Sequence, residues 1–235
     1  MSAAGQITTL EDVVRRIGEI GIVPVVRASG VEEARRAVDA ILEGGIPIVE
    51  ITMTVPGAVT VIRDIIRQLG SKVLVGAGTV VTREQAEASL EAGARFLVSP
   101  GMSVAMLEAA RSRATLAIPG ALTPTELMAA SAHGATLIKI FPCGSVGGPK
   151  YLKALRGPFP NLKIIPTGGV SLANAADYVA AGAFALGVGS DLVDTAALRQ
   201  GHPEKIVAAA RELAAVVQMA RRAATTVPQQ AASKS

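Results

Sequence analysis

A single lysine lies in the middle of an otherwise apolar run, residues 137–141 (LIKIF). Side chains alternate between the two faces of a β-strand, so Lys139 would share a face with Phe141. Burial disfavours the ammonium form of a lysine in such a strand, and a neutral amine near pH 7 can attack a ketone to form a Schiff base. The alternatives are a lysine whose ammonium group reaches the surface and one that pairs with a carboxylate.

A lone carboxylate occupies a second apolar run, residues 48–53 (IVEITM). Alternation places Glu50 on one face and three apolar side chains on the other, so we expect Glu50 to point into a barrel whose helices cover the apolar face. No other strand-like run holds a carboxylate, and no other holds a lysine at its centre. A glutamate and a lysine in one interior form an acid/base and nucleophile pair. A purely structural ion pair is the alternative, although burying two charges is a weak source of stability.

Eight apolar runs alternate with helical patterns after a predicted leading helix at residues 9–20, and the runs begin 20 to 26 residues apart. This spacing fits one strand plus one crossover helix. The runs are residues 22–27, 48–53, 73–75, 95–99, 115–118, 137–141, 163–166 and 184–188. Eight such units in about 200 residues predict an α/β fold, a single (β/α)8 TIM barrel with an extra N-terminal helix. A doubly wound open sheet is the alternative, but no glycine fingerprint follows the first run.

The predicted barrel forms one domain, and a short segment flanks it at each terminus of the chain. We expect residues 1–8 to be a flexible N-terminus, residues 9–222 to form the barrel, and residues 223–235 (AATTVPQQAASKS) to be a disordered tail. No secretory signal or transmembrane run is evident, so we expect a cytoplasmic protein.

Glycine and hydroxyl residues follow the last two strands, where TIM barrels recurrently bind phosphate. Thr167, Gly168 and Gly169 follow the seventh run, and Gly189 and Ser190 follow the eighth. Small residues let backbone N–H groups approach an anion, so these loops predict a phosphate site. Ordinary tight turns are the alternative for each loop alone.

Other candidate ligands for an organic acid lie at the predicted mouth. Thr79 follows the third run, Pro100 follows the fourth, and Arg27 ends the first. The Thr79 hydroxyl and nearby backbone donors suit a carboxylate. Arg27 is either an anion partner or an ordinary rim residue.

Composition argues against several other functions. The net charge is +4 with dispersed Lys and Arg, and aromatic residues make up only 3% of the chain, so the basic stripe with stacking rings of a nucleic-acid binder is absent. Cys143 is the only cysteine, which leaves no intrachain disulfide. His133 and His202 lack partners at ligand spacing, so we expect no metal.

The sequence resembles the 2-keto-3-deoxy-6-phosphogluconate (KDPG) and 4-hydroxy-2-oxoglutarate (KHG) aldolase family, bacterial class I aldolases, over residues 10–221. The motifs are VEITMT, VGAGTV, FLVSPG, IPGALTPTE, IKIFP, PTGGV and GVGS. The resemblance implies that Lys139 forms the Schiff base and that Glu50 shuttles the proton. The other implied contacts are Thr79 and Pro100 at the pyruvate end, Phe141 packed nearby, and Gly168, Gly169 and Ser190 at the phosphate. It also implies a homotrimer that needs no metal or other cofactor.

One position departs from the family pattern. Many members have an arginine four residues after the glutamate, where this chain has Thr54. Substrate preference is the property this affects, and Arg27 is a candidate replacement. We expect reversible cleavage of KDPG to pyruvate and glyceraldehyde 3-phosphate. The alternatives are KHG or the 6-phosphogalactonate stereoisomer as substrate and, in a different class, a catalytically silent barrel for sugar-phosphate binding or assembly.

Overall fold

The computed structural model describes residues 9–226, in which every strand pair is parallel. Hydrogen bonds order the strands as β5-β4-β3-β2-β1-β9 in one sheet and β6-β7-β8 in another. The strands are β1 (Ile22–Val26), β2 (Ile48–Thr52), β3 (Leu74–Gly78), β4 (Phe96–Val98), β5 (Leu116–Ile118), β6 (Gly120–Ala121), β7 (Leu137–Ile140), β8 (Lys163–Pro166) and β9 (Leu186–Val188). The predicted α/β class is confirmed.

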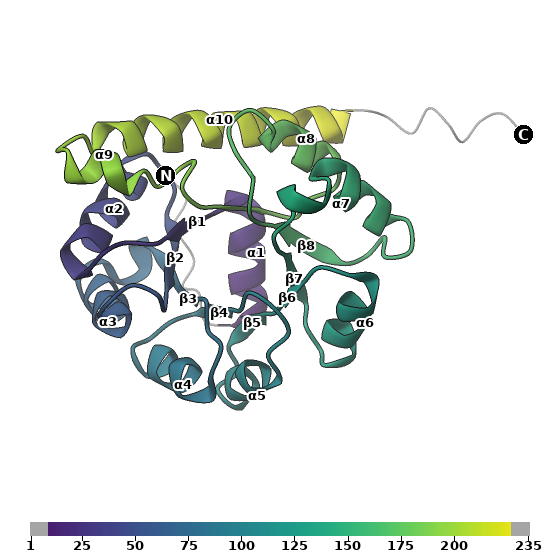
Figure 1. The fold of residues 1–235 in the computed structure, drawn as a ribbon, viewed down its shortest axis with the longest axis horizontal. Coiled ribbons are helices and arrows are strands. Elements are labelled where there is room, and N and C mark those ends of the chain that lie inside the picture. The colour runs from purple at the N-terminus through teal and green to yellow at the C-terminus, as the bar shows by residue number, and fades with distance from the viewer. Residues whose placement is uncertain (1–8, 227–235) are drawn as a thin grey trace, which may run out of the picture.

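Helices surround the strands on the outside (Figure 1). They are α2 (Val31–Glu43), α3 (Ala58–Leu69), α4 (Arg83–Glu91), α5 (Val104–Ser112), α6 (Pro124–Ala132), α7 (Pro149–Arg156), α8 (Ala175–Ala180), α9 (Thr195–Arg199) and α10 (Glu204–Thr226), with 3-10 turns η1 (Gly70–Lys72) and η2 (Gly144–Val146). Capping boxes at Thr82 and Thr123 start α4 and α6. The strands between the helices are almost entirely buried, as expected for a parallel sheet with helices on its outer face.

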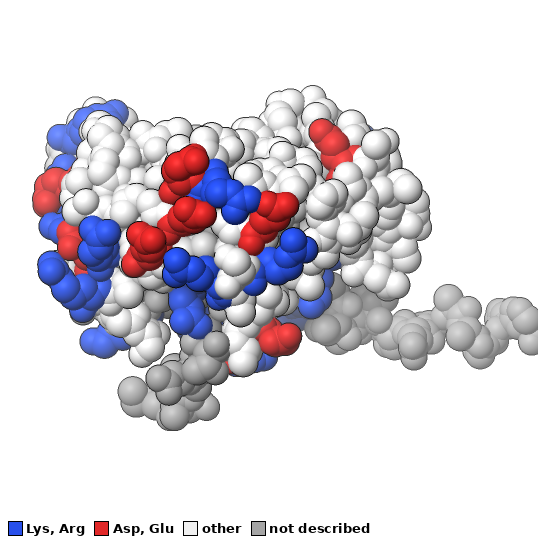
Figure 2. All heavy atoms as spheres, turned by 90° about the horizontal axis from the view of Figure 1, so that it is seen from below, with Lys and Arg blue, Asp and Glu red and all other residues white. Residues whose placement is uncertain are grey.

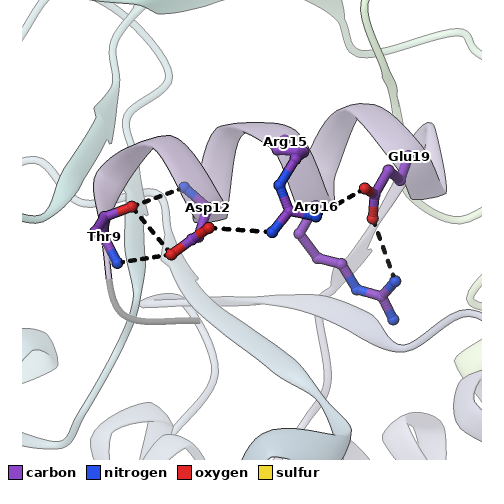
Figure 3. A network of polar contacts seen from close by, with 5 residues as sticks. All are labelled: Thr9, Asp12, Arg15, Arg16 and Glu19. Atoms are coloured by element: carbon purple, nitrogen blue, oxygen red, sulfur yellow. Dashed lines mark hydrogen bonds and ion pairs between the residues drawn. The ribbon is translucent and has the colours of Figure 1, made fainter. Parts of the chain in front are cut away.

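Helix α1 (Leu10–Ile20) lies in the middle of the ring of strands in Figure 1. Gly21 connects its end directly to the start of β1, so the helix covers the amino ends of the strands. Thr9 caps the helix and forms a capping box with Asp12 (Figure 3). Arg15 bonds Asp12 at 3.0 Å and Glu19 at 2.8 Å on the outer side of the helix. The opposite, carboxyl ends of the strands are left for the loops that carry the candidate site.

Two strands differ from the sequence prediction. Strand β3 continues through Gly78 instead of ending before the glycines. A Cβ on Gly76 would stand 2.2 Å from the Phe96 ring, so this glycine serves close packing within the strand and not a turn. The fifth predicted strand, residues 115–118, corresponds to β5, and an additional short strand, β6, follows it after Pro119, which has no N–H to donate to the ladder. The eight predicted strands therefore form two hydrogen-bonded sheets and not one uninterrupted ladder.

The predicted tail begins too early in the chain. Helix α10 runs to Thr226, so residues 223–226 are helical, in keeping with the high helix propensity of Ala223 and Ala224. The remaining predicted tail, residues 227–235, and the predicted flexible N-terminus, residues 1–8, lie outside the described residues. Within residues 9–226, no helix has the length and apolar character that crossing a membrane requires.

Candidate active site

Lys139 and Glu50 line the same small interior cavity. Each side chain is 3% exposed, one on β7 and the other on β2. The cavity has a volume of about 10 Å³, roughly the space of one water molecule. Its lining consists of Val23, Glu50, Val98, Ile118, Lys139, Ile165, Thr167 and Gly187. Strand alternation thus brings the two predicted catalytic side chains together, although they lie almost 90 residues apart in the sequence.

The surroundings of Lys139 favour a neutral amine. Burial lowers the pKa of Lys139, the negative charge of Glu50 raises it, and the positive charge of Arg27 lowers it, with a net shift below the ordinary value of 10.5. The Nζ atom lies 5.0 Å from the centroid of the Phe141 ring. A lysine with a depressed pKa, directed into a cavity, has the properties that a Schiff-base nucleophile requires.

Glu50 presents an unoccupied acceptor to the cavity. Its Oε1 atom is buried and has no hydrogen-bond partner among the described residues. No ion pair within 4.0 Å joins Glu50 to Lys139 in residues 9–226, so the structural ion pair considered from the sequence is not formed there. A buried carboxylate oxygen without a partner is unusual in a native protein and is suited to taking a proton from a bound molecule.

Gly78 makes room for this carboxylate. A Cβ added at Gly78 would stand 1.9 Å from Glu50 Oε1 and 2.5 Å from its Cδ. Gly187 likewise makes room for the Thr167 side chain, because a Cβ at Gly187 would stand 2.1 Å from the Thr167 hydroxyl oxygen. Sequence reasoning placed Gly78 after the third run and Gly187 inside the eighth, and it did not predict that either makes room for a buried side chain. The available signal was a glycine inside a strand, which often marks a close approach of another group.

A chain of hydroxyl groups leads from β2 to the mouth. The Thr52 hydroxyl donates to the Val26 carbonyl oxygen at 3.0 Å, so the Thr54 hydroxyl, 2.7 Å away, donates to Thr52. Thr54 is exposed, as is Arg27 at the end of β1. Arg27 Nη1 lies 3.1 Å from the position of a Cβ on Gly189. Arg27 therefore lies beside the predicted phosphate loop, and its charge also reaches Lys139.

The three residues predicted at the pyruvate end follow β3, β4 and β7. Thr79 has φ = 55°, a left-handed backbone that is strained for a β-branched residue and is found at functional sites more often than elsewhere. The Pro100 carbonyl oxygen stands 2.2 Å from the position of a Cβ on Gly120. The Phe141 ring packs beside Gly168, 3.2 Å from its Cβ position.

The predicted phosphate residues divide into two groups. Thr167 is 4% exposed, and its side chain lies in the cavity with Lys139. Gly168 and Gly169, with φ = 83° and 78°, are accessible at the rim, as are Gly189 and Ser190 after β9. Only these four are placed to meet a group that enters from solvent. Thr167 instead lies beside Lys139 and Glu50 in the cavity. Its contact with a phosphate stays a prediction.

The histidines and the cysteine lie outside this arrangement. His133 caps the end of α6, and His202 Nδ1 contacts Glu204 at 2.9 Å. Cys143 is buried, and burial raises the pKa of its thiol. Among residues 9–226, no three His, Cys, Asp or Glu side chains come together in a way that could hold a metal ion.

Comparisons with known proteins agree with this geometry. A family model for KDPG and KHG aldolases matches residues 13–209. The KHG/KDPG aldolase of Escherichia coli K12 is 38% identical over 191 residues, which cover 81% of this chain and 89% of the relative. A 2-dehydro-3-deoxy-phosphogluconate aldolase of Dickeya dadantii is 39% identical over 194 residues, 83% of this chain and 91% of the relative. A Legionella pneumophila KDPG aldolase, solved with pyruvate as a covalent carbinolamine intermediate, superposes with a TM-score of 0.79 at 31% identity, covering 85% of this chain and 97% of that one.

Proposed function

The chain belongs to the KDPG and KHG aldolase family and is a carbon–carbon lyase of the Schiff-base class, and we propose that it cleaves KDPG reversibly to pyruvate and glyceraldehyde 3-phosphate. The catalytic roles are assigned to Lys139 and Glu50 because both side chains line one cavity. In that cavity the pKa of Lys139 is lowered, and Glu50 Oε1 has no hydrogen-bond partner among the described residues. KHG and the 6-phosphogalactonate analogue of KDPG remain the alternative substrates.

In the proposed reaction, Lys139 Nζ attacks the C2 ketone of the substrate, and loss of water from the carbinolamine gives a protonated imine. This imine accepts the electron pair of the C3–C4 bond as that bond breaks. Glu50 removes the proton of the C4 hydroxyl through a water, so the aldehyde leaves as its carbonyl forms. The remaining enamine takes a proton at C3, and hydrolysis of the imine releases pyruvate and restores Lys139.

The mouth of the site holds the two ends of the substrate. We assign the pyruvate carboxylate to Thr79 and the backbone near Pro100, with Phe141 packed against the reacting carbons. These residues lie at the carboxyl ends of β3, β4 and β7, the edge towards which Lys139 and Glu50 also face. Thr54, which stands where many relatives have arginine, offers a hydroxyl that is already engaged with Thr52.

We assign the substrate phosphate to Gly168, Gly169, Gly189 and Ser190. Two rim loops with accessible glycine backbones support this assignment. Arg27 beside Gly189 supplies the positive charge. A phosphate held here would bring the opposite end of the same molecule towards Lys139.

A pyruvate-release assay coupled to lactate dehydrogenase tests the proposal with KDPG, its 6-phosphogalactonate analogue and KHG. We expect kcat/KM to be highest for KDPG, intermediate for the other phosphorylated acid and lowest for KHG. Lys139→Ala should reduce turnover of all three to background, whereas Lys163→Ala, a matched change at a strand start, should not. Equal turnover of KHG and KDPG would contradict the substrate assignment, and activity in Lys139→Ala would contradict the mechanism.

We further propose that the two sheets together form one closed eight-stranded barrel. Supporting this, an isolated parallel bridge joins Thr167 to Gly187 between the ends of β8 and β9, and the Phe184 N–H donates to Ile164 at 2.8 Å. On the other side, Pro119 alone separates β5 from β6. Hydrogen bonds thus cross between β8 and β9, and a single residue separates β5 from β6.

A cytoplasmic homotrimer is the proposed state of the enzyme. Figure 2 shows charges of both signs mixed over one part of a face and a nearly uncharged surface towards α6. That helix contains one charged residue, Glu126, and Met128 on it is 62% exposed. An apolar, charge-poor face is typical of contacts between subunits. Light scattering should give three times the 23.9 kDa of one chain, and Met128→Asp should reduce this mass if α6 lies at the interface.

A further inference from the structure

Glu33 is a buried carboxylate that the proposed reaction does not use. It lies in the first turn of α2 and is 5% exposed. Its Oε2 atom accepts hydrogen bonds at 2.5 Å from both the backbone N–H and the hydroxyl of Ser29. Its Oε1 atom accepts one from Arg199 Nη1 at 2.7 Å. A carboxylate is costly to bury unless such donors surround it, so this side chain holds its neighbours in a defined arrangement.

The donors come from two separate segments, the loop between β1 and α2 and the helix α9. Ser29 lies two residues after Arg27, in the segment between β1 and α2. Arg199 ends α9, the helix that follows the Gly189–Ser190 loop after β9. Glu33 thus joins the loop that carries Arg27 to the element that follows the candidate phosphate loop.

The loop that carries Arg27 also approaches the Gly189–Ser190 loop directly. Arg27 Nη1 lies 3.1 Å from the Cβ position of Gly189, and the Gly189 carbonyl accepts the N–H groups of Leu192 and Val193 at 3.0 and 2.9 Å. A second link runs between α2 and α9, where Arg36 donates to the Leu198 carbonyl at 3.3 Å. The position of the Arg27 guanidinium relative to Gly189 therefore depends on how α2 and α9 are joined.

We propose that Glu33 is a positioning residue that holds Arg27 against the Gly189–Ser190 loop, so that the phosphate end of the substrate meets a preformed cationic site. The inference rests on the proposed function, because it concerns the phosphate end of the same substrate. KHG carries no phosphate, and its second carboxylate is bonded directly to C4, so it does not extend to the position of the C6 phosphate of KDPG. Its binding should therefore depend much less on Glu33. A carboxylate that served stability alone would affect phosphorylated and unphosphorylated substrates alike.

The test compares Glu33→Gln with Glu32→Ala, which removes an exposed carboxylate one residue earlier in the same helical turn. For Glu33→Gln we expect the KM for KDPG to rise about tenfold, which corresponds to about 1.4 kcal/mol. Its kcat should stay within threefold, and its KM for KHG within twofold, of the wild-type values. Competitive inhibition by inorganic phosphate should weaken by a factor similar to that for KDPG. Glu32→Ala should leave all of these constants within twofold.

A double-mutant cycle with Arg27→Met distinguishes positioning from a general effect. If Glu33 acts through Arg27, adding Glu33→Gln to Arg27→Met should change the KM for KDPG by less than twofold. Additive effects, or a parallel rise in KM for KDPG and KHG, would overturn the inference. If Glu33→Gln does not fold, Ser29→Ala takes its place, because it keeps the carboxylate and removes only the Ser29 hydroxyl that donates to it. This variant should raise the KM for KDPG, but not for KHG, by a smaller factor. A wild-type enzyme that cleaves neither substrate would contradict the proposed function itself. If the wild type cleaves both substrates but Glu33→Gln changes the KM for KDPG and for KHG equally, only this inference is contradicted.

Discussion

Alanine at position 78 should impair catalysis while leaving the fold largely intact. The added methyl group would stand 1.9 Å from Glu50 Oε1, and ordinary van der Waals contact begins near 3.4 Å, so the oxygen has to move by about 1.5 Å. The atoms that must move all belong to the Glu50 side chain and none to the backbone, so the free energy of unfolding should fall by no more than the roughly 1–3 kcal/mol typical of an overpacked buried site.

A displacement of about 1 Å in a catalytic group can reduce a rate about 100-fold. We therefore expect kcat for Gly78→Ala to fall about 100-fold in the pyruvate-release assay, with KM for KDPG changed less than threefold. Gly30→Ala is the matched control, because a Cβ at Gly30 meets no atom within 4 Å and the residue lies in the segment between β1 and α2, just before α2 begins. A Gly78→Ala enzyme with kcat within threefold of the wild type would refute the placement of Glu50 as the proton acceptor.

Three further predictions follow from charge and burial. Arg27 lowers the pKa of Lys139 and Glu50 raises it. In labelling of Lys139 by trinitrobenzenesulfonate, Arg27→Met should therefore shift the pH dependence to higher pH, and Glu50→Gln should shift it to lower pH. Shifts of both variants in the same direction would contradict these charge effects. Burial raises the pKa of Glu33, but hydrogen bonds from Ser29 and Arg199 outweigh it and hold the pKa below 4.5. The stability that Glu33 contributes is thus complete above pH 4.5 and is lost as the pH falls through the lowered pKa, so urea unfolding should show a smaller difference between wild type and Glu33→Gln at pH 3.5 than at pH 6. Phe96 is 0% exposed, and Phe96→Ala should cost about 3–5 kcal/mol in the same urea experiment, with a loss below 1 kcal/mol contradicting its place in the core.

That Glu50 and Lys139 face one cavity could be predicted from sequence because a strand has a period of two residues. Once residues 48–53 and 137–141 were read as strands, alternation determined the direction of Glu50 and Lys139, and both point into one cavity. The rim glycines were found for a related reason, since they follow strands whose ends meet at one edge. The local pattern was sufficient for these residues.

The remaining features depend on contacts between segments that are distant in the sequence. The third strand was predicted to end at residue 75, but it continues to Gly78, which lies against Glu50. Thr167 was grouped with the rim by its neighbours in sequence, whereas its side chain is turned into the cavity. Residues 120–121 were expected in the loop after the fifth strand, but they form β6 beyond Pro119 and pair with β7.

Glu33 shows the same limit most clearly. Nothing in the run of residues 31–36 distinguishes Glu33 from Glu32, because both are acidic residues in the first turn of one helix. What distinguishes them is Arg199, which lies 166 residues further along the chain and reaches only Glu33. Such a pairing becomes evident only when the strands have brought the first and last units side by side, as β1 and β9 are.

Borohydride trapping tests the central claim most directly. The protein is incubated with pyruvate, reduced with sodium borohydride, digested and analysed by mass spectrometry, with Lys163 as an internal reference on the neighbouring strand. The account predicts a reduced pyruvyl adduct on Lys139, absent in Lys139→Ala and absent without pyruvate. No adduct, or an adduct distributed equally over Lys139 and Lys163, would contradict it.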